Sequence, residues 1–263
     1  MRVTWLDGAL VDPASAALSA DDPGVRWGEG LFETMRAEGG AVPLLGRHLD
    51  RLLGSAGALG LAPMPTRVQM TAAVGDALAA AGAGPLRVRL RATPAPSLMV
   101  EVAPEAALGA DPPALAAVSV RGAWMPANRM AEHKSLSYGA HRVSQRAAQA
   151  AGAAHALLLD ADGRLGEAAL ASVICSLDGA LVSAPARGLL PGVARAVVME
   201  ALPVAERTLD EDAWRAADEI VLINAVRGAM AVVEVDGRPV GAGLPGPAAR
   251  RIMDVLRAAL AAG

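Results

Sequence analysis

The segment Lys134-Ser135-Leu136-Ser137-Tyr138 contains the only lysine of a 263-residue chain in which lysine and arginine together number 24. Arginine stays protonated in proteins, whereas a buried lysine can lose its proton and form a Schiff base with a carbonyl group. A composition bias towards arginine would also leave few lysines. The residues around Lys134 and further along the chain therefore have to distinguish a chemical role from such a bias.

On both sides of this segment, the sequence predicts helices mixed with strands. Apolar residues at three- and four-residue spacing predict helices over 47–59 and 68–81, and residues 86–92 alternate as a half-exposed strand does. A further helix is expected over 138–151, followed by several short strands. The proline-rich stretch 110–113 resembles a linker. We therefore predict an α+β protein of two domains, 1–112 and a larger C-terminal domain, 113–263, that carries Lys134 and the site.

Composition excludes several classes of function. The net charge is −3 and the pI about 5.8, which argues against binding of nucleic acid or a membrane surface through a basic patch. No uncharged run reaches the roughly 18 apolar residues of a membrane span, and no secretion leader is recognisable, so we expect a cytoplasmic protein. The single cysteine, Cys175, excludes an internal disulfide and is expected in the core.

Common catalytic motifs are absent. The sequence has no GxGxxG after a strand, no GxxxxGK[ST] and no GxSxG. The four histidines lack HExxH-type spacing, so no metal site is expected.

Two polar features nevertheless stand out. Glu167 precedes the apolar run 168–175, where a carboxylate is costly unless a cation lies beside it. The residues from Pro191 to Arg195 predict a helix that begins at a small-residue turn, whose backbone N–H groups suit a phosphate. Taken singly, each feature is equally compatible with a surface glutamate or an ordinary helix start.

The order of five motifs changes this interpretation. The motifs are Gly28-Glu29-Gly30-Leu31-Phe32-Glu33-Thr34-Met35-Arg36, Arg47-His48-Leu49-Asp50-Arg51-Leu52, Lys134-Ser135-Leu136-Ser137-Tyr138, Gly163-Arg164-Leu165-Gly166-Glu167 and Leu190-Pro191-Gly192-Val193-Ala194-Arg195. With these motifs in this order, the chain resembles the class IV aminotransferases, the fold-type IV pyridoxal-phosphate enzymes, from its first hairpin to Val232. This family includes branched-chain and D-amino-acid aminotransferases and aminodeoxychorismate lyases.

The resemblance implies a two-domain, D-amino-acid-aminotransferase-like fold and a role for each matching residue. It implies that Lys134 is the Schiff-base lysine and proton shuttle, and that Glu167 is the partner of the protonated ring nitrogen of pyridoxal phosphate. It also implies that Tyr138 lies near the phenolic oxygen of the cofactor and that Arg51 contacts the cofactor phosphate. The remaining implied cofactor contacts are the N–H groups of Val193 and Ala194, and Asn224 with Ala225, where many branched-chain enzymes have a phosphate-binding threonine.

Two catalytic functions and one non-catalytic function follow from the resemblance. The leading hypothesis is aminodeoxychorismate lyase, which eliminates pyruvate from 4-amino-4-deoxychorismate and gives 4-aminobenzoate for folate synthesis. The chain length, the short connection 91–97 and Asn224-Ala225 favour it by family association. The alternative is an aminotransferase for branched-chain or D-amino acids. The non-catalytic hypothesis is a relative that binds cofactor or ligand without turnover. Lys134 and Glu167 argue against it, because such a protein has no chemical need for either residue.

The resemblance further implies a small amino-acid-like substrate and a homodimer. Arg87, Arg89 and Arg91 alternate along the predicted strand and are candidates either for a substrate carboxylate or for an exposed strand face.

Overall fold

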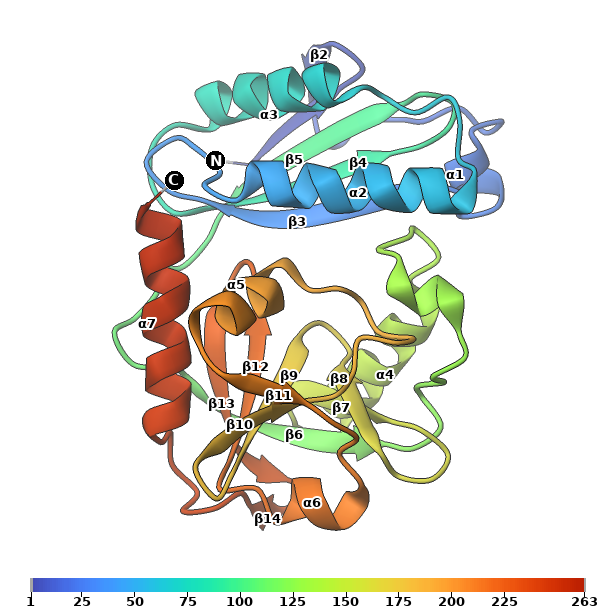
Figure 1. The fold of residues 1–263 in the computed structure, drawn as a ribbon. Coiled ribbons are helices and arrows are strands. Elements are labelled where there is room, and N and C mark those ends of the chain that lie inside the picture. The colour runs from blue at the N-terminus through green and yellow to red at the C-terminus, as the bar shows by residue number, and fades with distance from the viewer. Residues whose placement is uncertain (1, 263) are drawn as a thin grey trace. The chain divides into compact units, whose positions relative to one another are not determined.

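The computed structural model describes residues 2–262, which form two compact units (Figure 1). Unit 1 contains the chain up to Ala107, the segment His133–Ser137 and the last residues from Ala259. Unit 2 contains Leu108–Glu132 and Tyr138–Ala258.

This division differs from the predicted domains 1–112 and 113–263 in two respects. The chain passes from unit 1 to unit 2 after Ala107, and Lys134 belongs to unit 1 rather than to the C-terminal part. The physical reason is strand pairing, because Lys134 and Ser135 pair with Leu31 and Phe32 at the edge of the N-terminal sheet.

Unit 1 is an antiparallel sheet with two long helices packed against it (Figure 1). The strand order is β2-β1-β5-β4-β3. The elements are β1 Val3–Leu6, β2 Ala9–Val11, α1 Pro23–Arg26, β3 Leu31–Ala37, α2 Leu45–Leu59, α3 Arg67–Ala81, β4 Leu86–Ala92 and β5 Leu98–Pro104.

The predicted elements of unit 1 are confirmed. Thr66 caps α3 through a reciprocal capping box with Gln69, which explains why the helix begins there. Along β4, Val88 and Leu90 are buried while Arg87 and Arg89 are exposed. One face of this sheet thus belongs to the core formed with α2 and α3.

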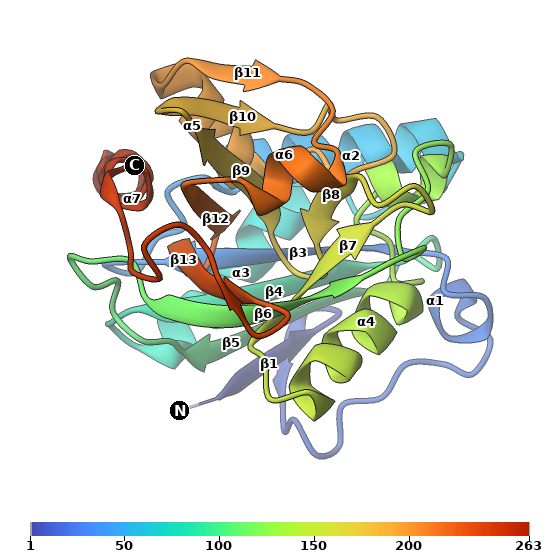
Figure 2. The same cartoon turned by 90° about the horizontal axis from the view of Figure 1, so that it is seen from below.

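Unit 2 is a strongly curved mixed sheet with helices beside it (Figure 2). The strand order is β11-β10-β9-β12-β13-β6-β7-β8, and β14 pairs with β13. Its strands are β6 Ala114–Val120, β7 His155–Leu159, β8 Leu165–Ala168, β9 Ser172–Leu177, β10 Ala180–Ser183, β11 Val204–Glu206, β12 Glu219–Asn224, β13 Gly228–Val235 and β14 Arg238–Pro239. Its helices are η1 Arg129–Glu132, α4 Gly139–Ala150, α5 Val193–Ala201, α6 Glu211–Arg215 and α7 Pro247–Ala261, whose last turn clusters with unit 1.

The α+β class and the core position of Cys175 are confirmed. Cys175 is fully buried on β9, and this burial raises the pKa of its thiol to about 12. It is therefore a packing residue. No helix among residues 2–262 combines the length and the apolar character that crossing a membrane requires.

Candidate active site

Lys134 lies on a short segment that extends the sheet of unit 1. The amide of Phe32 donates a hydrogen bond to the carbonyl of Lys134, and the amide of Leu136 donates to the carbonyl of Gly30, both at 2.9 Å. Since β3 is the edge strand of this sheet, its outer edge can accept an added strand. The Lys134 ammonium lies 4.6 Å from the centre of the Phe32 ring. The backbone of β3 thus fixes where the single lysine stands.

Both ends of this segment are also held. His133 Nδ1 lies 3.0 Å from Ser55 Oγ on α2. At the other end, the Ser137 hydroxyl donates to the Gly28 carbonyl at 3.4 Å. Gly28 has φ +69°, and a Cβ there would lie 2.5 Å from Ser137 Oγ, so only glycine fits this approach.

Arg51, the predicted phosphate ligand, is held by a buried carboxylate on β3. Its Nε donates to Glu33 Oε1 at 2.8 Å and its Nη2 to Glu33 Oε2 at 2.5 Å. Burial of Glu33 disfavours its charge. The hydrogen bond with His48 and the charge of Arg51 outweigh this cost and lower the pKa of Glu33 from 4.5 to about 2. Glu33 is therefore an anion at neutral pH.

His48 is the second partner of Glu33. Its Nδ1 lies 2.7 Å from Glu33 Oε2, and the side chain is buried. Burial lowers the pKa of His48, and the charges of Arg51 and Lys134 act in the same direction, against the raising effect of Glu33. The imidazole is thus neutral. Because an ionised carboxylate has no proton to give, Nδ1 carries the hydrogen.

In unit 2, the structure brings Tyr138 and Glu167 together through a histidine. Glu167 lies on β8 and is buried, with Oε1 3.6 Å from His141 Nε2. The Tyr138 ring stacks on the His141 ring, with centroids 4.3 Å apart and planes 4° apart. Tyr138 and His141 are three residues apart at the start of α4, so they share one side of its first turn.

The residues that follow Glu167 contact three other parts of the predicted site. The Tyr138 hydroxyl donates to the Ala169 carbonyl at 3.0 Å. The Asn224 amide donates to the Leu170 carbonyl at 3.4 Å. Ser172 lies against the glycine that precedes α5. The turn between β8 and β9 is therefore the point on which the unit 2 site residues converge.

Val193 and Ala194 open helix α5, as predicted. The residue before them, Gly192, is the N-cap of this helix and provides no side chain to cap it. A Cβ on Gly192 would lie 2.5 Å from Ser172 Oγ. A helix start of this kind directs backbone N–H groups and a positive partial charge outward, which favours an anion.

Asn224 ends β12 and shapes the turn that follows. Its Oδ1 accepts hydrogen bonds from the amides of Val226 at 3.0 Å and Arg227 at 2.8 Å. Ala225, within this turn, offers only backbone atoms and a methyl group. Any polar contact to a ligand at this position must come from the backbone or from Asn224.

The three arginines of β4 differ in their surroundings. Arg87 pairs with Glu105 at 3.2 Å, and Arg91 forms an ion pair with Glu101. The guanidinium carbon of Arg89 lies 5.6 Å from the centre of the Phe32 ring. Acidic residues on β5 (Glu101) and directly after it (Glu105) thus explain Arg91 and Arg87 as parts of a charged strand face.

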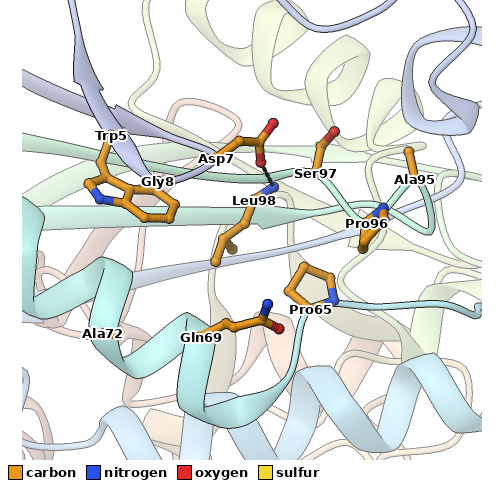
Figure 3. A pocket seen from close by; sticks show the side chains of 10 residues that line it. All are labelled: Trp5, Asp7, Gly8, Pro65, Gln69, Ala72, Ala95, Pro96, Ser97 and Leu98. Atoms are coloured by element: carbon orange, nitrogen blue, oxygen red, sulfur yellow. Dashed lines mark hydrogen bonds between the residues drawn. The ribbon is translucent and has the colours of Figure 1, made fainter.

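A separate pocket of about 470 Å³ lies in unit 1, where α3 meets the turns of the sheet (Figure 3). Trp5, Pro65 and Pro96 form apolar walls, and Asp7 accepts a hydrogen bond from the Leu98 amide at 2.6 Å. None of the predicted site residues is among those that line this pocket. It is therefore distinct from the residues described above.

Sequence reasoning assigned no role to Glu33, His48 and His141, although signals for them exist. Glu33 lies two residues from both Leu31 and Met35 on a strand, so the three side chains share one face, which is the core face. His48 lies three residues before Arg51 on a helix, and His141 three residues after Tyr138. Periodicity alone identifies these positions, but only the tertiary contacts identify their partners.

The chain as a whole is similar to known proteins. Residues 30–235 match the family described as amino-transferase class IV. A protein from Methanocaldococcus jannaschii, provisionally named a branched-chain-amino-acid aminotransferase, is 28% identical and the match covers 89% of this chain and 88% of that protein. A bifunctional aminodeoxychorismate lyase / D-amino acid transaminase from Mycobacterium tuberculosis is 29% identical over 90% of this chain and 92% of its own.

Solved structures share the whole fold. A protein described as a hypothetical aminotransferase from Mycobacterium tuberculosis, in its PLP-bound form, superposes with a TM-score of 0.87 and 26% identity. The match covers 99% of both chains. The predicted fold-type IV architecture is confirmed, since structures of such transaminases align over nearly the entire chain.

Proposed function

This chain belongs to the class IV aminotransferase family of pyridoxal-phosphate enzymes, and from this premise we propose that it is an aminodeoxychorismate lyase. One observation carries the assignment of the cofactor residues. Tyr138, Asn224 and the start of α5 all contact the turn that follows Glu167. The choice of reaction is supported by the similarity to the bifunctional mycobacterial lyase.

The residues present fit pyridoxal phosphate. The cofactor needs a primary amine, an anion beside its ring nitrogen and donors for its phosphate. The chain offers its single lysine, a buried carboxylate in Glu167 and the side-chain-free helix start at Gly192. When bound, the cofactor supplies an aldehyde carbon for amines and a conjugated ring that accepts an electron pair from the substrate.

Lys134 would hold the cofactor covalently until the substrate amine displaces it, and it would then move the proton. In the proposed reaction, the lysine amine freed by this exchange takes the proton from the substrate carbon that carries the amino group. The C–O bond to the enolpyruvyl group then breaks, and the released enolpyruvate takes up a proton to become pyruvate. Docking against β3 limits the freedom of the lysine backbone, so the amine starts from one fixed Cα position.

Glu167 would keep a proton on the ring nitrogen of the bound cofactor. An ionised carboxylate beside a protonated nitrogen also satisfies its own charge, which its burial would otherwise penalise. Tyr138 is assigned to the phenolic oxygen, and its stacking on His141 fixes the plane of its ring.

Four groups are assigned to the phosphate. These are the guanidinium of Arg51, the amides of Val193 and Ala194, and the turn of Asn224 and Ala225. Because Ala225 has no hydroxyl, this turn contributes through its backbone, whose conformation Asn224 sets. The same proposal includes a cytoplasmic location and a homodimer, and light scattering of the purified protein tests the dimer.

Turnover without an acceptor tests the reaction. The purified holoenzyme, given aminodeoxychorismate and no keto acid, should release pyruvate and 4-aminobenzoate over many turnovers per site. Elimination consumes no second substrate, whereas transamination stops after one turnover per site until a keto acid is supplied. Product release limited to one equivalent, or none, would contradict the lyase assignment.

Transamination of branched-chain or D-amino acids is the second candidate, supported by the similarity to the Methanocaldococcus jannaschii protein. Leucine and D- or L-alanine should leave the visible absorbance of the bound cofactor largely unchanged if the lyase proposal holds. Rapid bleaching by one of them, reversed by 2-oxoglutarate, would move the assignment to the aminotransferase.

A further inference from the structure

Arg51 is assigned to the cofactor phosphate, and two further residues surround it in unit 1. We infer that Glu33 and His48 are positioning residues that orient Arg51 for phosphate binding. The inference rests on the proposed role of Arg51. Neither residue is assigned any contact with the cofactor or the substrate, so their influence passes through the arginine.

Glu33 fixes the plane of the Arg51 guanidinium. Both carboxylate oxygens are used, one by Nε and the other by Nη2, which is the planar two-bond pairing that arginine makes with carboxylates. The Glu33 side chain is 0% exposed and that of Arg51 is 10% exposed, so water does not compete for this pair. A guanidinium held in this way presents its remaining N–H groups in one direction.

His48 fixes the carboxylate in turn. Its neutral imidazole donates through Nδ1 to Glu33 Oε2, the same oxygen that receives Arg51 Nη2. Oε2 therefore accepts hydrogen bonds from two sides, which holds the carboxylate against rotation. His48 and Arg51 lie three residues apart on α2 and meet the same group, so the helix and the strand are locked together there.

Strand β3 links this cluster to the lysine. The amide of Phe32, the residue directly before Glu33, holds the carbonyl of Lys134. Strand β3 thus holds the backbone of Lys134 through Phe32, and it orients Arg51 through the side chain of the next residue, Glu33. Preorganisation of this kind lowers the entropy lost when a ligand binds.

The phosphate of the cofactor provides the test. Dissociation constants are measured for pyridoxal phosphate and for pyridoxal, which lacks the phosphate, by titration of apoprotein followed at the visible band. For Glu33→Gln we expect pyridoxal phosphate to bind about tenfold more weakly, while pyridoxal binding changes less than about twofold. A general structural defect would weaken both ligands equally, and that result would overturn the inference.

Two further variants make the test specific. In an Arg51→Ala background, adding Glu33→Gln should not change the ratio of the two dissociation constants further, because the group through which Glu33 acts is gone. His48→Asn, which leaves the Glu33–Arg51 pair in place, should weaken pyridoxal phosphate binding about threefold and spare pyridoxal. This variant carries the test if Glu33→Gln does not fold.

Asp50→Asn is the matched control. Asp50 lies on the same helix and pairs with Arg67 in an exposed ion pair, so it should change neither dissociation constant. If the wild type prefers the phosphorylated ligand and Glu33→Gln keeps this preference, the inference fails while the proposed function stands. If the wild type shows no such preference, the role of Arg51 in the proposed function fails, and the inference with it.

Discussion

Replacing Glu33 by glutamine should destabilise unit 1 by an amount that depends on pH. The folded protein holds the pKa of Glu33 at about 2, against 4.5 for an unperturbed glutamate. A carboxylate with a lowered pKa in the folded state stabilises that state above its unfolded pKa. This contribution is lost as the pH falls from about 4.5 towards 2.

The size of the effect follows from this shift. Each pH unit between the two pKa values corresponds to about 1.4 kcal/mol, so the charge of Glu33 contributes about 3 kcal/mol at pH 7. At pH 3.5, with the unfolded chain mostly protonated, about 2 kcal/mol of this contribution is left. The glutamine of Glu33→Gln still accepts a hydrogen bond from His48 but offers Arg51 no charge.

Urea unfolding of the apoprotein at pH 7 and at pH 3.5 measures the difference between wild type and Glu33→Gln. Hydrogen exchange on peptides from β3 and α2 assigns the transition to unit 1, since the two units need not unfold together. We expect the wild type to be more stable at both pH values, and by a smaller margin at pH 3.5.

The control for stability is again Asp50→Asn, which removes one negative charge from an exposed ion pair on α2. It should cost less than about 1 kcal/mol at pH 7. Two results would show that Glu33 is not the strongly paired anion that its contacts indicate. In one, Glu33→Gln lowers the free energy of unfolding as little as this control does; in the other, it lowers that free energy by as much at pH 3.5 as at pH 7.

Three further variants test the proposed cofactor residues. Lys134→Arg should keep the fold but lose all activity, because a guanidinium cannot bond to the cofactor aldehyde, and borohydride should attach the cofactor to the Lys134 peptide only in the wild type. Glu167→Gln should retain the cofactor and lose about a hundredfold or more in kcat, because a neutral amide does not keep the ring nitrogen protonated; near-normal turnover would assign that role to another residue. Asn224→Asp keeps the acceptor for the amides of Val226 and Arg227 but adds a negative charge beside the proposed phosphate site. The affinity for the cofactor should therefore fall about tenfold with little change in Tm, and an unchanged affinity would remove this turn from the phosphate site.

The sequence determined the local elements and the chemical character of the residues. Helices α2 and α3 and strand β4 appear where apolar periodicity predicts them, because this periodicity depends only on residues that are close together in the sequence. The single lysine and the small-residue turn at Gly192 are also visible without coordinates.

The tertiary structure decided which residues are partners. Phe32 and Lys134 lie far apart in the sequence, and only the free edge of β3 brings the lysine segment into unit 1. Glu33 contacts His48 and Arg51, which lie 15 and 18 residues away in the sequence, because β3 and α2 pack against each other. Such contacts depend on how elements dock, and docking is a property of the whole chain rather than of any local pattern.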